Sequence, residues 1–349
     1  MSVLERSIPD RLGLRRGDRV RVRRLDEILA TLDERGCLDA LPFMPEMRAF
    51  CGQTFVVSAS AHKTCDTISN TGGRRMERAV HLADLRCDGA AHGGCQAACL
   101  LFWKEAWLER LDEADLPLET GRESRPRPDP VCDERRLEEA TRRSASDADD
   151  ELRYVCQTTE LVRATRFLPW WDLRQYVRDV RSRNVSLGEL ANALYFRFTV
   201  RAMHLVGYRF WRGLYDRIQR SIGGDPFPAI EGRLDRTPRE TLDLEPGEEV
   251  EVKPLGEIVA TLDRRNRNRG MAFDKEMAPF CGERHRVFQR VERIIDEASG
   301  RMLELPNGCL MLEGVVCRSR YSERRIACPR AIYSYWRECW LRRVDTPPS

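Results

Sequence analysis

Gly17-Asp18-Arg19-Val20-Arg21-Val22 returns later in the chain as Gly247-Glu248-Glu249-Val250-Glu251-Val252, at an offset of 230 in the numbering. From Gly17 to Gly52, 17 of 36 positions are identical at this offset, without a gap. Chance does not produce such similarity, so the sequence predicts one domain written twice. In both copies valine alternates with charged residues, which is typical of a half-buried strand.

The repeat continues into a cysteine-rich part of each copy. Cys87 matches Cys317 at the same offset, and an offset of 233 then pairs Cys95 with Cys328 and Trp107 with Trp340. We expect a hairpin over 291–296 and 302–305, and a closing helix over 95–111 and again over 329–344. The predicted domains are a first repeat at 1–115 and a second repeat at 247–349.

The residues between the repeats differ in composition. Residues 119–150 are rich in Pro, Arg, Asp and Ser, which predicts a flexible linker at 116–150. Ser186-Leu187-Gly188-Glu189 is a capping-box signature, so we expect a helical insert with an extended return at 151–246. The predicted fold class is α+β: two duplicated small SH3-like β-barrel units, each closed by a Cys-rich segment and a C-terminal helix, joined by a disordered linker and a helical insert.

The barrel prediction rests on a resemblance. The Gly-Asp-x-Val-x-Val opening and the later Cys51-Gly52 strand resemble the SH3-like barrels of translation factors and nitrile hydratase β-subunits, over about 45 residues of each repeat. The whole chain is also similar to an uncharacterised bacterial family of two-repeat, cysteine-rich proteins with SH3-like barrel units. These resemblances imply the fold of each unit and no catalytic residues.

The cysteines are the main chemical signal. An odd number of them, 13, and an N-terminus without a signal peptide argue against a disulfide framework. Metal or redox chemistry in the cytoplasm is the better interpretation. The predicted first metal site is Cys65, Cys87, Cys95 and Cys99. The predicted second site has three thiols, Cys309, Cys317 and Cys328, and is either open to substrate or a decayed copy. Four cysteines without a partner in the other repeat are assigned no role: Cys37, Cys132, Cys156 and Cys339.

Four thiolates fit either an iron–sulfur cluster or structural zinc. The widely spread ligands around Gly93-Gly94 and the Cys328-Pro329 pair favour the cluster, and the sequence contains no paired Cys-x-x-Cys zinc knuckles. Three histidines are auxiliary candidates, with an ordinary hydrogen-bonded role as the alternative for each: His92, His62 and His81. Glu46 and Glu276 occupy equivalent repeat positions and are interpreted as capping or ion-pairing residues.

The predicted helix over 186–222 is amphipathic. Arg197, Arg201 and Arg212 share one side on a helical projection, which fits a peripheral membrane contact or a protein partner. The alternative is that the apolar side docks between the two repeat units. No stretch approaches the roughly 18 to 20 apolar residues of a spanning helix.

Three function classes remain. The first is an iron–sulfur protein acting as an oxidoreductase or an accessory enzyme in a bacterial biosynthetic pathway. The second is a zinc-stabilised SH3-like binding or scaffold protein for a protein, peptide or RNA partner. The third is a metal-free scaffold that tethers a complex near a membrane. The net charge of +3 and the lack of an aromatic and basic stripe argue against nucleic acid. Phosphate-loop, serine-hydrolase and His-Glu-x-x-His motifs are absent from the sequence, so the substrate stays open.

Overall fold

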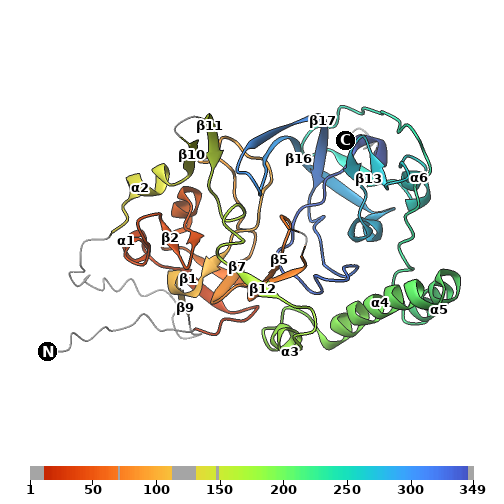
Figure 1. Cartoon of the computed structure of the whole chain (residues 1–349), viewed down its shortest axis with the longest axis horizontal. Helices are drawn as coiled ribbons and strands as arrows, with labels where there is room; N and C mark the ends of the chain where they lie inside the picture. Colours follow the sequence, from red (N-terminus) through yellow and green to blue (C-terminus); the bar gives the residue numbers. More distant parts are fainter. Residues whose placement is uncertain (1–11, 70, 112–130, 147–148, 345–349) are drawn as a thin grey trace, which may run out of the picture. The chain divides into compact units, whose positions relative to one another are not determined.

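The computed structural model describes residues 12–69, 71–111, 131–146 and 149–344 (Figure 1). It is a mixed α+β protein with antiparallel sheets and α-helices of 5 to 20 residues. The chain divides into two compact units. Unit 1 holds the described residues up to Ser186 together with Ile295–Leu303 and Cys328–Arg330, and unit 2 holds the other described residues.

Unit 1 is built on a five-stranded sheet in the order β8-β7-β4-β1-β9. Its strands are β1 (Arg19–Val22), β4 (Thr54–Ser60), β7 (Ala79–Leu82), β8 (Trp103–Lys104) and β9 (Leu108–Arg110). β1 pairs antiparallel with both β4 and β9, and its valines are buried while its arginines are exposed, as predicted. On the inner face, Phe43 packs edge-on against Trp103 and Trp107.

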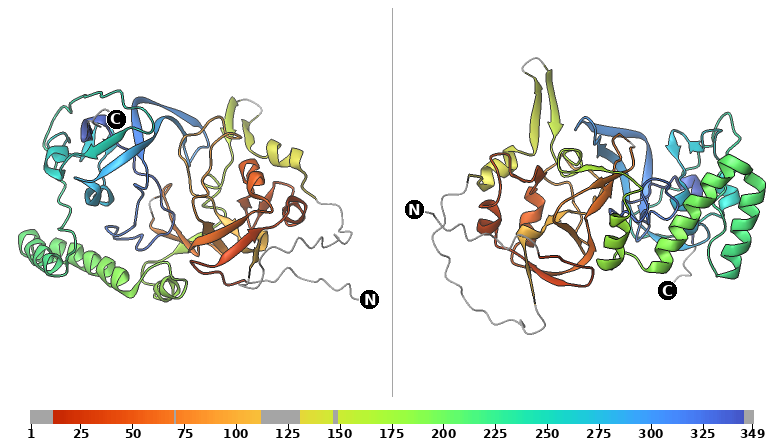
Figure 2. Two further views of the ribbon diagram at one scale, coloured as in Figure 1. Left: turned by 180° about the vertical axis from the view of Figure 1, so that it is seen from behind. Right: turned by 60° about the horizontal axis from the view of Figure 1, so that its bottom comes forward.

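Smaller elements surround this sheet. Helices are α1 (Leu25–Leu29), α2 (Glu134–Glu139) and α3 (Arg174–Arg181), with 3₁₀ turns η1 (Pro45–Phe50) and η2 (Glu105–Trp107). β2 (Cys37–Leu38) pairs with β3 (Leu41–Pro42), and β5 (Lys63–Cys65), β6 (Gly73–Arg75) and β12 (Arg166–Leu168) form a second sheet. The hairpin of β10 (Arg142–Ser146) and β11 (Asp149–Tyr154) extends away from the five-stranded sheet (Figure 2).

Unit 2 has a four-stranded sheet in the order β17-β16-β13-β18. The strands are β13 (Glu249–Val252), β16 (Arg284–Ile295), β17 (Met302–Leu312) and β18 (Leu341–Arg343). The other elements are α4 (Leu187–Val206), α5 (Tyr208–Ser221), α6 (Leu255–Val259), β14 (Arg267–Asn268), β15 (Met271–Ala272), η3 (Lys275–Phe280) and η4 (Glu338–Trp340). The hairpin predicted between 291 and 305 is confirmed: the Asp296 N–H donates to the Arg301 carbonyl at 2.8 Å.

The predicted closing helices are wrong. Residues 95–111 contain β8, η2 and β9 in place of a helix, and residues 329–344 contain η4 and β18. Ala98 and Ala331, which occupy equivalent positions of the two repeats, both have positive φ, at 46° and 45°, and such a residue interrupts an α-helix. Trp103 and Trp107 are nevertheless both buried, because a strand followed by a 3₁₀ turn also brings them to one side.

The linker prediction is wrong for 131–146, whereas 112–130 lie outside the described residues. Asp133 caps α2 by accepting from the Arg136 N–H at 2.8 Å. Leu137 and Cys132 are buried in the core of unit 1. These two apolar side chains attach the segment to unit 1. The charged residues around them gave the sequence the composition of a flexible linker.

The helical insert contains two helices where the sequence predicted one. α4 begins at Leu187, as the capping box predicted, but Gly207 has a φ of 144° and separates it from α5. Arg197 and Arg201 therefore lie on α4, and Arg212 lies on α5. The buried faces of both helices pack around Phe196, Tyr215 and Phe227 in unit 2. Within the described ranges, no helix has the length and apolarity needed to cross a bilayer.

Candidate metal centre

Four cysteines line one cavity of about 40 Å³ in unit 1. They are Cys87, Cys95, Cys99 and Cys156, and His92 and Glu297 line the same cavity. A cavity of this size holds an ion or a water molecule. The remaining wall is largely apolar, with Met44, Leu101 and Ile295 among its residues.

Backbone geometry in the 87–99 loop brings three of these thiols together. The Cys87 N–H donates to the Cys99 carbonyl at 2.9 Å, which places the two ends of the loop side by side. Gly89 has a φ of 73°, and a Cβ there would lie 2.1 Å from the Cys95 carbonyl oxygen. Only glycine fits a position with both constraints, so the close folding of this loop depends on Gly89.

The fourth thiol comes from the residues after β11. Gln157, next to Cys156, is buried, and its side-chain amide bonds the backbone of Phe102 in both directions, accepting at 2.8 Å and donating at 2.9 Å. The same Nε2 donates to the Pro42 carbonyl at 3.0 Å. A buried amide whose hydrogen bonds are satisfied has a fixed position. Gln157 therefore holds the neighbouring Cys156 against the core of unit 1.

A mixed group of donors adjoins this cavity. One ligand atom each from Glu46, Cys87 and His92 lies within 4.8 Å of the other two. His92 Nδ1 is 2.6 Å from Glu46 Oε1, and His92 Nε2 is 3.0 Å from the Val155 carbonyl oxygen. Because a carbonyl and a carboxylate both only accept, Nε2 carries a hydrogen toward Val155 and Nδ1 carries one toward Glu46. A metal that binds at Nδ1 has to replace that second hydrogen, while the Nε2 hydrogen bond holds the ring in place. The Glu46 Oε2 atom is buried, and no described residue forms a hydrogen bond with it.

Burial favours the protonated form of three thiols of this cavity, Cys87, Cys95 and Cys99. It raises the pKa of Cys99 to about 12, and it also raises the pKa values of Cys87 and Cys95. Burial acts on Glu46 in the same direction, but the hydrogen bond and charge of His92 outweigh it and lower the pKa of this carboxyl group. A metal binding here therefore has to displace thiol protons.

The first predicted site is brought together in part. Cys87, Cys95 and Cys99 line the cavity, whereas Cys65 lies on β5 beside Arg330. Cys156, to which the sequence assigned no role, takes a place at the cavity. No sequence signal pointed to it, since it lies in the insert and has no repeat counterpart.

Two of the predicted auxiliary histidines lie elsewhere. His62 Nε2 is 3.1 Å from Asp179 Oδ1, an aspartate that also pairs with Lys63. His81 is fully buried, its Nδ1 is 2.9 Å from the Leu101 carbonyl oxygen, and burial lowers its pKa to about 4. Both are integrated into the core of unit 1, and His92 is the histidine that joins the thiols.

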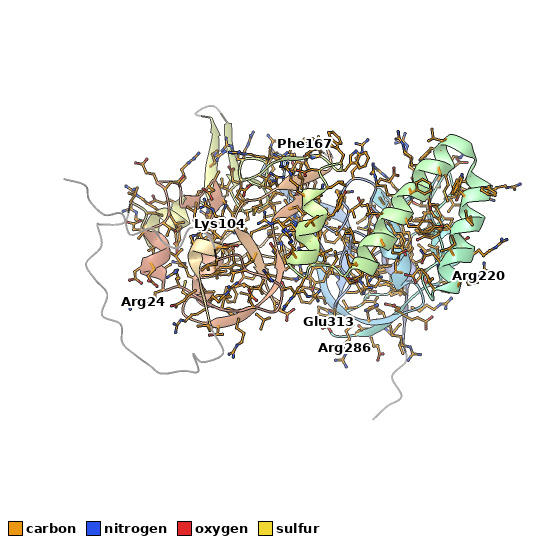
Figure 3. All side chains as sticks on the ribbon, turned by 90° about the horizontal axis from the view of Figure 1, so that it is seen from below. Arg24, Lys104, Phe167, Arg220, Arg286 and Glu313 are labelled. Carbon is orange, nitrogen blue, oxygen red and sulfur yellow. The ribbon has the colours of Figure 1, made fainter. Side chains whose placement is uncertain are left out.

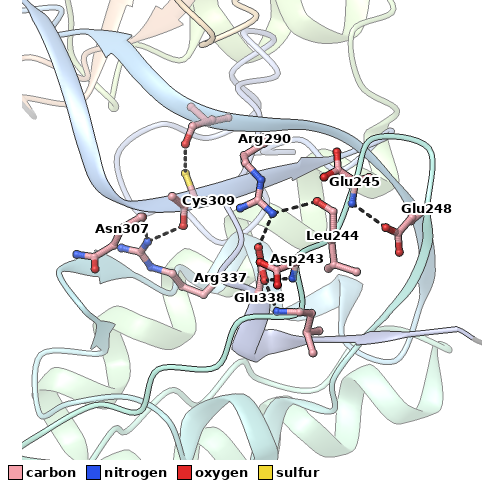
Figure 4. A network of polar contacts seen from close by, with 12 residues as sticks. Asp243, Leu244, Glu245, Glu248, Arg290, Asn307, Cys309, Arg337 and Glu338 are labelled. Carbon is pink, nitrogen blue, oxygen red and sulfur yellow. Dashed lines mark hydrogen bonds and ion pairs between the residues drawn. The ribbon is translucent and has the colours of Figure 1, made fainter.

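The second predicted site has a different arrangement. The Cys309 thiol donates to the Val291 carbonyl at 3.7 Å (Figure 4), and Cys317 Sγ is 3.6 Å from Ser319 Oγ. Cys328 belongs to unit 1, whereas Cys309 and Cys317 belong to unit 2. Among the described residues of unit 2, no three metal donors lie within 4.8 Å of one another.

The repeat shows which part of the Glu46 group recurs. Glu46 accepts from the Ala91 N–H, and its repeat counterpart Glu276 accepts from the Tyr321 N–H. The position equivalent to His92 is Ser322. The loop-capping role of the glutamate is thus common to both repeats, and the histidine is confined to the first.

The comparison of this chain with protein-family models, curated proteins and solved structures found no match.

Proposed function

We propose that this chain is a cysteine-ligated metalloprotein whose centre is an iron–sulfur cluster held by Cys87, Cys95, Cys99 and Cys156. The observation that carries the proposal is that these four thiols line one cavity. Four cysteine thiolates are the ligand set of such a cluster. The cavity has to widen to accept it, because a volume of about 40 Å³ corresponds to one ion or water molecule. A redox role, as an oxidoreductase or an accessory enzyme in a bacterial biosynthetic pathway, follows from that cofactor.

The four sulfur atoms are not grouped as closely as the ligands of one zinc ion. With Zn–S bonds of about 2.3 Å, thiolates of one tetrahedral zinc lie about 3.8 Å apart. Within the part of the chain that the structure describes, no three of these four sulfur atoms lie within 4.8 Å of one another. In a cubane cluster each cysteine binds a different iron atom, so the sulfur atoms stand farther apart.

We also propose that the two repeats are duplicated SH3-like barrel units serving as the scaffold. The order of elements supports this. The first repeat begins with β1, α1 and η1, and the second repeat has β13, α6 and η3 at the equivalent positions. β9 and β18 are both edge strands, and each pairs with the first strand of its repeat.

A second candidate is a zinc-stabilised binding or scaffold protein, with zinc on Glu46, Cys87 and His92. Two observations favour it: one ligand atom of each residue lies within 4.8 Å of the other two, and Glu46 Oε2 has no hydrogen-bond partner among the described residues. Zinc binds nitrogen, oxygen and sulfur ligands in proteins. Such a site leaves one coordination position for Cys156 or for water.

Metal analysis of protein purified without oxygen separates the two candidates. We expect several iron atoms and a similar amount of acid-labile sulfide per chain, with a broad visible absorption that bleaches on reduction. One zinc ion per chain in a colourless protein would contradict the cluster. In that case Glu46→Gln should reduce the zinc content, whereas in the cluster protein the same variant should keep its iron.

We further propose that α4 and α5 contact an anionic membrane surface. Their exposed apolar side chains include Phe198, Leu205 and Phe210, which are 57, 74 and 69% exposed. Arginines lie among them, and Arg220 extends outward from α5 (Figure 3). Apolar side chains flanked by arginine are the composition of helices that lie in an anionic interface.

Vesicle flotation tests this contact. The protein should float with vesicles containing phosphatidylserine, and the double variant Phe198→Ser, Leu205→Ser should float at least several-fold less. Leu173→Ser, which changes an equally exposed leucine in unit 1, serves as the control and should float normally. Equal flotation of all three proteins would exclude α4 and α5 as the contact.

A further inference from the structure

Arg330 is a buried cation beside the metal centre, in unit 1. Its side chain is 3% exposed, and it lies in the Cys328–Arg330 segment. Nη2 donates to Glu297 Oε1 at 2.6 Å, and Nη1 donates to Thr67 Oγ1 at 2.9 Å. Nη1 is also 3.9 Å from the Cys65 sulfur atom. A buried guanidinium held by this many partners has a fixed position.

Arg330 is connected to the cavity through both charge and contact. Its ion-pair partner Glu297 lines the cavity, as does Cys99. Burial by itself would lower the pKa of Arg330, but the charge of Glu297 is the largest opposing influence, and the pKa lies above its ordinary value. Lys63, the other buried cation of this region, is already paired with Asp179.

The charge balance changes when the thiols bind a cluster. Without a cluster, Glu297 is the carboxylate that pairs with Arg330, at 2.6 Å. A cluster with four thiolates carries net negative charge, and one added electron makes it more negative by one unit. Burial, nearby charges and hydrogen bonds to sulfur are the factors that set the potential of such clusters.

We propose that Arg330 and Glu297 act as opposing positioning residues that set the reduction potential of the cluster. Arg330 stabilises the more negative, reduced cluster and raises the potential, and Glu297 destabilises it and lowers the potential. This inference rests on the proposed iron–sulfur function and adds to it the residues that control the redox state.

Reductive titration of the iron-loaded full-length protein with dithionite tests the proposal, with the midpoint potential as the readout. Arg330→Gln, which removes the charge but keeps hydrogen-bonding groups, should shift the potential to more negative values. Glu297→Gln, a substitution of the same size, should shift it to more positive values. Arg330→Lys should stay near the wild-type potential. Arg337→Gln removes a buried arginine in unit 2 and should leave the potential unchanged.

Shifts of opposite sign support the proposal, because general loosening of the site would move both variants in the same direction. Unchanged potentials, or shifts of the same sign, would overturn it. If Arg330→Gln cannot retain iron, a more positive potential in Glu297→Gln together with a wild-type potential in Arg330→Lys supports the proposal, and an unchanged potential in Glu297→Gln overturns it. A wild-type protein that contains zinc and no iron refutes the proposed function itself, which the metal analysis detects separately.

Discussion

Cys156→Ser should lose the cluster, with iron per chain falling about tenfold or more relative to the wild type. The substitution removes one of the four thiols that line the cavity. Serine has almost the same size and can keep the contact that Cys156 Sγ makes with Thr158 Oγ1 at 3.1 Å, so the fold should persist. Changes outside the ligand shell already cost roughly 10- to 100-fold in metal affinity. Iron and sulfide assays on protein purified without oxygen measure the effect.

Two matched variants make this experiment decisive. Cys132→Ser alters a buried cysteine in the core of unit 1 that does not line the cavity, and it should keep its iron. Cys65→Ser should also keep its iron. If Cys65→Ser loses the iron and Cys156→Ser retains it, the ligand set predicted from the sequence is correct and the set of the cavity is wrong.

Gly89→Ala should also abolish metal binding, and it should destabilise unit 1. The added Cβ would lie 2.1 Å from the Cys95 carbonyl oxygen and 2.8 Å from its nitrogen, so the loop must move Cys95 away from the other thiols. The positive φ adds about 1 to 2 kcal/mol of backbone strain. Iron content and thermal unfolding, followed by circular dichroism, measure the two consequences.

Gly94→Ala is the control for the backbone strain alone. Gly94 has nearly the same φ, 74° against 73°, but a Cβ there would meet no atom within 4 Å. This variant should lower the melting temperature by a few degrees and keep its iron. Equal iron content in the two alanine variants would show that the packing of Gly89 against Cys95 does not hold the site.

The sequence predicted the elements whose pattern is local. The alternating valines of β1, the N-terminus of α4 and the hairpin before Arg301 are all where short-range rules placed them. The closing helices failed because the i, i+4 spacing of Trp103 and Trp107 does not distinguish a helix from a strand followed by a 3₁₀ turn. Sheet pairing of β9 with β1 determines that choice, and it joins strands that are far apart in the sequence.

The site was predictable only within its contiguous part. Cys87, Cys95 and Cys99 belong to one loop, where glycines and close spacing indicated a metal site. Cys156 reaches the cavity through the hairpin β10–β11 and the anchoring of Gln157, which are long-range contacts without a sequence motif. Cys65, a predicted ligand from the same repeat, lies beside Arg330 in the structure.

X-ray absorption of the anaerobically purified protein, at the iron and zinc edges, tests the central claim most directly. A cluster on Cys87, Cys95, Cys99 and Cys156 predicts an iron edge with sulfur neighbours alone in the first shell and a second shell of iron atoms. A zinc edge with mixed nitrogen, oxygen and sulfur neighbours, and no iron signal, would contradict the cluster and identify Glu46, Cys87 and His92 as the metal site.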